Sequence, residues 1–142
     1  DSPHRDFRRA RSAANSIIPT TTGAAKALTN IFPHLKFNLG GCGIRVPVIN
    51  GSLTDLTCVV GKKTDVQSVN NVFKFHSKKN LKKILQYIDE PIVSRDVIGN
   101  NHSCVFDSQL TSVLGSMIKI VSWYDNENGY SNRLIDVISK WF

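Results

Sequence analysis

The amino-acid sequence predicts an α+β domain, with helices packed on one face of a mainly antiparallel, mixed sheet. Hydrophobic residues make up 41% of the 142 residues, which is enough for a packed core in a chain of this size. The apolar residues follow a strand pattern in several short runs and a helical pattern in others. The predicted order is a strand pair, two helices, several strands and a last helix, an order typical of α+β domains.

The N-terminal part divides at Pro19. Residues 1–19 lack a sustained apolar period, so we predict an extended, arginine-rich loop with one helical turn near Arg8 to Asn15. A helix is predicted from residues 20–28, because threonine is a competent cap and the alanines that follow favour helix. Pro33 is expected to end it. We therefore expect an arginine-rich loop over 1–19 and a single domain over 20–142.

The middle of the chain predicts two strands followed by two helices. Residues 43–49 and 53–60 are predicted to pair antiparallel across Gly51 and Ser52, with Ile44 and Val46 facing the core and Arg45 facing away from it. One helix follows Asp65, and a second is predicted from Asn80. Their apolar stripes consist of Val66, Val69, Val72 and Phe73, and of Leu81, Ile84, Leu85 and Ile88.

The C-terminal part predicts three strands and one helix. The strands are expected at residues 92–98, 103–106 and 117–124. The last helix is expected from about Gly129, with an apolar stripe along one face. That stripe consists of Tyr130, Leu134, Val137, Ile138 and Trp141.

Charge is unevenly distributed along the chain. The formal net charge is +7, and the segment from Lys62 to Lys83 contains seven lysines and a single acid, Asp65. A solvated surface accounts for such a segment, and the alternative is a basic module that binds RNA or another acidic partner. No run of 18 apolar residues occurs, so we expect neither a membrane span nor a membrane partner.

The cysteines and histidines predict neither a disulfide framework nor a metal site. Cys42, Cys58 and Cys104 are widely spaced and form no CxxC, a usage that suits a reducing cytoplasm. None lies in a pattern that predicts a nucleophile activated by a base. The four histidines show no metal-ligand spacing, so we expect no metal.

Three places could bind a ligand. Thr22-Gly23 precedes a predicted helix, where free amides attract anions, although from spacing alone an ordinary threonine cap is the simpler explanation. Arg45 could bind phosphate through its planar fork, or be a plain exposed arginine. In the polar turn 123–130, the asparagine side-chain amides could match a carboxamide ligand, while a structural turn is the alternative.

Taken together, six segments resemble the C-terminal catalytic domain of the glyceraldehyde-3-phosphate dehydrogenase family. They occur in the family's order and extend across essentially the whole chain. They are Asp6–Ala14, Ile17–Ala27, Arg45–Pro47, Val93–Asp96, Ser122–Glu127 and Gly129–Ser131.

The resemblance implies a cytoplasmic, homotetrameric, NAD-dependent enzyme of glycolysis that oxidises glyceraldehyde-3-phosphate and consumes inorganic phosphate. Carried over by position, Thr22 and Gly23 would bind the attacking phosphate, and Arg45 and Arg9 would help to hold substrate phosphate groups. Asn126 would bind the nicotinamide carboxamide, with Tyr130 near the ring. Residues 1–19 would form an inter-subunit loop.

The family's cysteine nucleophile and general-base histidine have no counterpart among these residues. The resemblance therefore assigns no catalytic residue to this chain, which we expect to be inactive alone. Besides the basic binding module, a second alternative to an enzyme function is a domain that serves only contacts between subunits.

Overall fold

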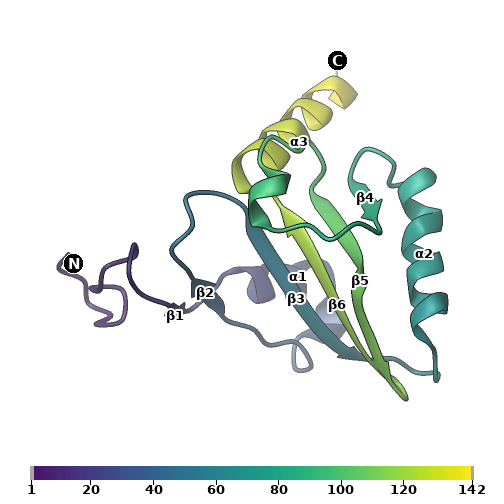
Figure 1. The fold of residues 1–142 in the computed structure, drawn as a ribbon, viewed down its shortest axis with the longest axis horizontal. Coiled ribbons are helices and arrows are strands. Elements are labelled where there is room, and N and C mark those ends of the chain that lie inside the picture. The colour runs from purple at the N-terminus through teal and green to yellow at the C-terminus, as the bar shows by residue number, and fades with distance from the viewer. Residues whose placement is uncertain (1, 142) are drawn as a thin grey trace. The chain divides into compact units, whose positions relative to one another are not determined.

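The computed structural model describes residues 2–141 (Figure 1). The chain divides into two compact units, Asp1–Ile49 and Asn50–Phe142. No helix among the described residues has both the length and the apolarity needed to cross a bilayer.

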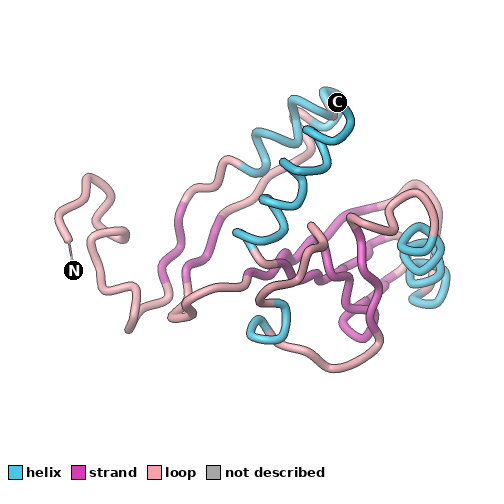
Figure 2. Tube along the Cα trace, turned by 90° about the horizontal axis from the view of Figure 1, so that it is seen from above, coloured by secondary structure: helices cyan, strands magenta, loops and turns pink. Residues whose placement is uncertain are grey.

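The first unit is built on a two-stranded ribbon. Strand β1 (Ile18–Thr20) pairs antiparallel with β2 (Gly43–Arg45), and the two run side by side in Figures 1 and 2. Between them lie helix α1 (Ala24–Ile31) and the 3₁₀ turn η1 (Pro33–Leu35). Pro33 directly follows the cap of α1, which confirms its expected role as the end of that helix.

The second unit contains a four-stranded mixed sheet in the order β3-β6-β5-β4. Strand β6 (Met117–Tyr124) pairs antiparallel with β3 (Ser52–Val59) on one side and with β5 (Cys104–Leu114) on the other, while β4 (Leu85–Ile88) runs parallel to β5. With α2 (Val66–Lys78), the 3₁₀ turn η2 (Ser94–Val97) and α3 (Asn126–Trp141), this arrangement confirms the predicted α+β class.

Asp65 is the N-cap of helix α2, and its side chain accepts hydrogen bonds from the amide and hydroxyl of Ser68. These bonds hold the pKa of Asp65 below its usual value, the amide bond contributing most. The helix lies beside β4 and β5 (Figures 1 and 2), and the Phe73 ring stacks on that of Phe106 with centroids 3.9 Å apart. Phe106 is fully buried, so this contact lies at the centre of the core. The other buried apolar residues of this unit are Val69, Leu85, Val97, Val105 and Val121.

The predicted pairing of residues 43–49 with 53–60 is wrong. β2 pairs with β1, and β3 pairs over its full length with β6. Strand β2 is also shorter than expected, because it ends at Arg45 and Pro47 cannot donate to a ladder. Residues 18–20, expected at the end of a loop and the start of a helix, form its partner strand instead.

The helix predicted from Asn80 and the strand predicted over 92–98 are also wrong. Leu85 to Ile88 form β4, because pairing with β5 outweighs the helical spacing of the local apolar residues. Residues 94–97 form η2, where the Asp96 carboxylate accepts a hydrogen bond from the amide of Val93. The strand expected over 103–106 extends to Leu114, while that over 117–124 is confirmed.

Helix α3 follows β6 directly and lies at the end of the sheet (Figure 1). It starts at Asn126, one turn earlier than predicted. Its predicted apolar stripe is largely exposed, from 47% at Leu134 to 83% at Trp141. Apolar area of this extent marks a surface that is suited to a partner.

Candidate functional site

Arg9 is fixed at the end of β1 by contacts from the same unit. Its Nη2 donates to Thr20 Oγ1 at 2.8 Å and to the carbonyl of Thr21 at 3.4 Å, and its Nε lies 3.9 Å from an Asp6 carboxylate oxygen. Thr20 is buried, while Arg9 itself is exposed. The guanidinium therefore has one amino group tied to the ribbon, and Nη1 has no protein partner within residues 2–141.

Thr22 and Gly23 form the entry to α1. Gly23 is the cap residue, and the Thr22 hydroxyl accepts a 3.2 Å hydrogen bond from the amide of Ala24. Both residues are exposed, and a Cβ placed on Gly23 would meet nothing within 4 Å. The start of the helix is thus open, and its positive end is a favourable position for an anion.

Arg45 ends β2 and lies opposite Ile18, while Gly43 lies opposite Thr20. Directly opposed residues of an antiparallel pair project to the same side, so Arg45, Ile18 and Thr20 share one face of the ribbon. A Cβ on Gly43 would lie 3.9 Å from both Thr20 Oγ1 and the Thr22 Cβ, so Thr22 lies beside the same face. Arg45 and Arg9 therefore both belong to the side of the ribbon that carries these threonines.

The expectation that Ile44 faces the core is wrong. Ile44 is 60% exposed, whereas Ile18 on the opposite face is 6% exposed. The covered face of this ribbon is the one that carries Ile18 of the partner strand β1. The alternation of apolar and polar residues within 43–49 therefore does not predict it. Arg45 thus lies on the covered side of the ribbon, although its own side chain is exposed.

The second group of predicted residues lies in the unit Asn50–Phe142. Asn126 and Tyr130 are one turn apart on α3 and share a face of that helix. Asn126 Oδ1 accepts a short hydrogen bond from the Ser52 hydroxyl, which leaves the amide NH₂ as a donor. Tyr130 is 66% exposed. An NH₂ donor and an exposed ring on one face fit a ligand that carries a carboxamide on an aromatic ring.

Sequence reasoning missed Asp125, which positions the start of α3. Its carboxylate accepts from the amides of Glu127 and Asn128 through Oδ1 and from the amide of Gly99 through Oδ2. These bonds hold its pKa below the usual aspartate value, with Asn128 as the largest cause. An aspartate before a helix is a recognisable cap signal, but the expected start near Gly129 placed the cap too late.

Two glycines fix the elements around this group. Gly51, in the left-handed region at φ +88°, lies so close to Ser94 that an added Cβ would collide with its carbonyl oxygen. Gly129 is buried in the first turns of α3, where an added Cβ would lie 3.1 Å from the carbonyl oxygen of His102. The absence of a side chain at residue 129 lets the helix lie this close to the 102–103 backbone without displacing it.

The cysteines show no sign of activation. Cys42 is exposed, while Cys58 and Cys104 are half-buried, and within residues 2–141 no histidine nitrogen bonds to a sulfur. Burial raises the pKa of the Cys104 thiol, and a hydrogen bond with Ser122 only partly offsets this. No group of three metal-ligating side chains is found in the described part of the chain.

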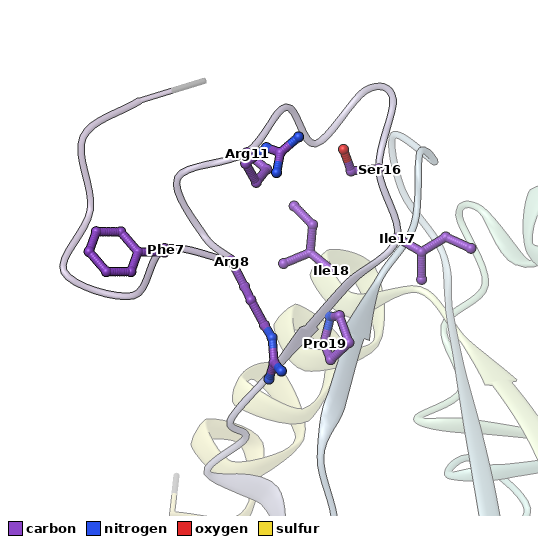
Figure 3. Close-up of a pocket in the computed structure, with 7 residues that line it drawn as sticks. All are labelled: Phe7, Arg8, Arg11, Ser16, Ile17, Ile18 and Pro19. Atoms are coloured by element: carbon purple, nitrogen blue, oxygen red, sulfur yellow. The ribbon is translucent and has the colours of Figure 1, made fainter.

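An open pocket of about 430 Å³ is lined by residues between Phe7 and Pro19. These residues are close in sequence to the predicted anion-binding residues but do not include them. Figure 3 shows Arg8 and Arg11 extending from the N-terminal loop, with Ile18 between them. None of Arg9, Thr22, Gly23 and Arg45 lines this pocket. The predicted phosphate-binding residues are therefore grouped on the ribbon and the start of α1, outside the hollow.

Comparison with known proteins assigns the chain to a family. The family model described as glyceraldehyde 3-phosphate dehydrogenase, C-terminal domain, matches residues 1–126. A glyceraldehyde-3-phosphate dehydrogenase of Mycobacterium avium is 52% identical over 139 residues, which is 98% of this chain and 41% of that protein. Those of Mycobacterium leprae (52% over 138 residues) and Streptomyces avermitilis (50% over 137 residues) are similar to the chain over comparable shares.

The chain spans about two fifths of the length of these curated relatives. The match confirms the resemblance found in the sequence motifs. The chain belongs to the glyceraldehyde 3-phosphate dehydrogenase family and corresponds to its C-terminal domain.

Proposed function

We propose that this chain supplies the phosphate-, substrate- and nicotinamide-contacting part of an NAD-dependent, phosphorylating glyceraldehyde-3-phosphate dehydrogenase. The observation that carries the proposal is the arrangement at the start of α1. There the Arg9 guanidinium is held at Thr20, next to the open Thr22-Gly23 entry and on the ribbon face of Arg45. Two guanidiniums and a helix start form a donor set that suits phosphate.

In this proposal Thr22 and Gly23 bind inorganic phosphate through the threonine hydroxyl and the backbone amide. Arg9 and Arg45 neutralise its charge and that of the substrate phosphate. Holding the phosphate in a fixed orientation makes its attack on the oxidised substrate effectively unimolecular. The cysteine that forms the covalent intermediate is supplied by another part of the parent enzyme.

NAD, when bound, accepts the hydride from the substrate. The Asn126 NH₂ group would donate to the carboxamide oxygen of its nicotinamide, and Ser52 holds that amide in orientation. Tyr130, one turn further, would lie against the ring. Asp125 fixes the backbone from which both side chains project.

We further propose that the parent enzyme is a cytoplasmic homotetramer in which residues 1–19 contact a neighbouring subunit. Its substrates are glyceraldehyde-3-phosphate, inorganic phosphate and NAD. A basic module for RNA and a domain that serves only oligomer contacts are the competing functions. The similarity to a dehydrogenase, 52% identity over 98% of the chain, favours the enzyme function over these two alternatives.

A chimera tests this function. The portion of the Mycobacterium avium enzyme that precedes the matched region is fused to this chain, and NADH formation from glyceraldehyde-3-phosphate is followed with and without phosphate. We expect phosphate-dependent turnover in the chimera and none from the chain alone, because its thiols lack an activating base. The matched control is the chimera with Asn126→Ala, for which we expect a raised KM for NAD. A folded chimera that produces no NADH would contradict the proposal.

A further inference from the structure

Thr20 is the one buried polar residue among the described residues of the unit Asp1–Ile49. It is 8% exposed, lies on the ribbon face shared with Arg45, and directly contacts a predicted phosphate-binding side chain. Thr20 is the first of three consecutive threonines, and the family resemblance assigns a role only to the third, Thr22. Because Thr20 is buried and its hydroxyl is already bonded to Arg9 and to the Thr21 carbonyl, we expect it to act on a ligand through a neighbour.

The hydrogen-bond directions at Thr20 are fully determined. Its hydroxyl proton is donated to the Thr21 carbonyl at 2.7 Å, so the oxygen can only accept from the Arg9 Nη2 group 2.8 Å away. The same Nη2 also reaches the Thr21 carbonyl at 3.4 Å. Thr20 and the carbonyl of Thr21 therefore form one acceptor pair that anchors a single amino group of Arg9.

This anchoring has a consequence for the remainder of the guanidinium. Because the group is planar, fixing Nη2 on these two oxygens, of which the Thr20 hydroxyl is partly buried, limits where Nη1 can point. A long arginine in an otherwise exposed loop would lose considerable rotational entropy on binding an anion, and the Thr20 contact removes part of that loss beforehand. The acidic contact from Asp6, at 3.9 Å, is too long to provide the same restraint.

We propose that Thr20 is a positioning residue: its buried hydroxyl orients Arg9 so that the free edge of the guanidinium can bind phosphate beside Thr22 and Gly23. This inference rests on the proposed function and adds to it a residue that does not touch the ligand. Thr20→Val keeps the β-branched shape and removes only the hydroxyl, whereas Thr20→Ser retains the hydroxyl.

The test is a titration of the full 142-residue chain with inorganic phosphate, followed through the amide resonances of Thr22 and Gly23 and the Nε–H resonance of Arg9. We expect Thr20→Val to weaken phosphate binding about tenfold, the scale of one hydrogen bond to a charged group. Thr20→Ser should bind within about twofold of the unmodified chain. The matched control is Thr29→Val, because the Thr29 hydroxyl bonds only the Lys26 carbonyl within α1.

A double-mutant cycle separates positioning from a general loss of structure. If Thr20 acts through Arg9, Thr20→Val should cost nothing further in the background of Arg9→Ala. Unchanged phosphate affinity in Thr20→Val, or additive losses in the double variant, would overturn this inference and leave the phosphate site intact. Failure of the unmodified chain to bind phosphate would instead overturn the proposed function, and the role of Thr20 with it.

Discussion

The two units of this chain differ sharply in how much core they contain. Among the described residues of Asp1–Ile49, one apolar side chain, Ile18, is buried, whereas those of Asn50–Phe142 include six, Phe106 among them. Yet the smaller unit carries four of the six predicted binding residues. These four residues are positioned by hydrogen bonds such as that of Arg9 with Thr20. The predicted phosphate-binding residues and the main hydrophobic core therefore lie in different units.

The largest expected effect comes from the core of the second unit. Phe106→Ala removes a fully buried ring and its stack with Phe73, and we expect a loss of about 3–5 kcal/mol in the free energy of unfolding. Urea denaturation measures it. Phe37→Ala, at a 91% exposed residue of the first unit, is the control and should change stability by no more than about 0.5 kcal/mol. Equal losses in the two variants would remove the contrast between the units.

Hydrogen exchange tests the contrast directly. No residue of α1 is buried, so its amides should exchange through local opening, at least about 30-fold faster than the most protected amides of β5 and β6. Native-state exchange monitored by nuclear magnetic resonance gives both rates in one sample. Uniform protection across α1, β5 and β6 would show that the two units unfold as one.

A smaller effect is expected at Asp125. Because its pKa in the folded chain lies below the value of 3.8 expected for the unfolded chain, its contribution to stability is present above that value. It is lost as the pH falls through the folded pKa. Asp125→Asn should lower stability by about 1 kcal/mol at neutral pH and make the denaturation midpoint less dependent on pH below 4. Asp136→Asn, at a more exposed pair with Arg133, serves as the comparison. An unchanged pH profile in Asp125→Asn would contradict the assignment.

The smallest effect concerns thiol reactivity and leaves the fold unchanged. Cys42 of the first unit is exposed, whereas burial raises the pKa of Cys104 in the second. We expect iodoacetamide at neutral pH to alkylate Cys42 at least about tenfold faster than Cys104. Mass spectrometry of peptides from a time course provides the rates. Faster labelling of Cys104 would mean that β5 opens readily and that the second unit is less rigid than its core implies.

Predictions from the sequence are correct where local residues determine the element and wrong where a distant partner strand does. The helix from Val66 and the strand from Met117 are confirmed because their apolar patterns are regular, and the helix also has Asp65 as its cap signal. Residues 85–88 have helical spacing, but they gain more from pairing with β5, a partner that is distant in sequence. Local pattern cannot reveal such a pairing, and the same is true of β1 with β2.

For the candidate site, the sequence motifs indicated the positions, and the structure adds the hydrogen bonds that hold Arg9 and Asn126. The role of Asn126 as the first residue of α3 was recognisable in principle from the preceding aspartate. The hydrogen bond of Thr20 with Arg9 was not, because nothing in three consecutive threonines indicates which hydroxyl is buried. That distinction arises only when β1 pairs with β2 and turns Ile18 and Thr20 to the covered side.

The buried glycine in α3 also restricts how this region could change. Since residue 129 lies against the carbonyl of His102, the first turns of the helix cannot slide or rotate without opening that contact. A change in ligand preference at the start of α3 would therefore require substitution of Asn126 or Tyr130, because the backbone stays in place. Under the proposed function, cofactor preference at these two positions would change by single substitutions, in discrete steps.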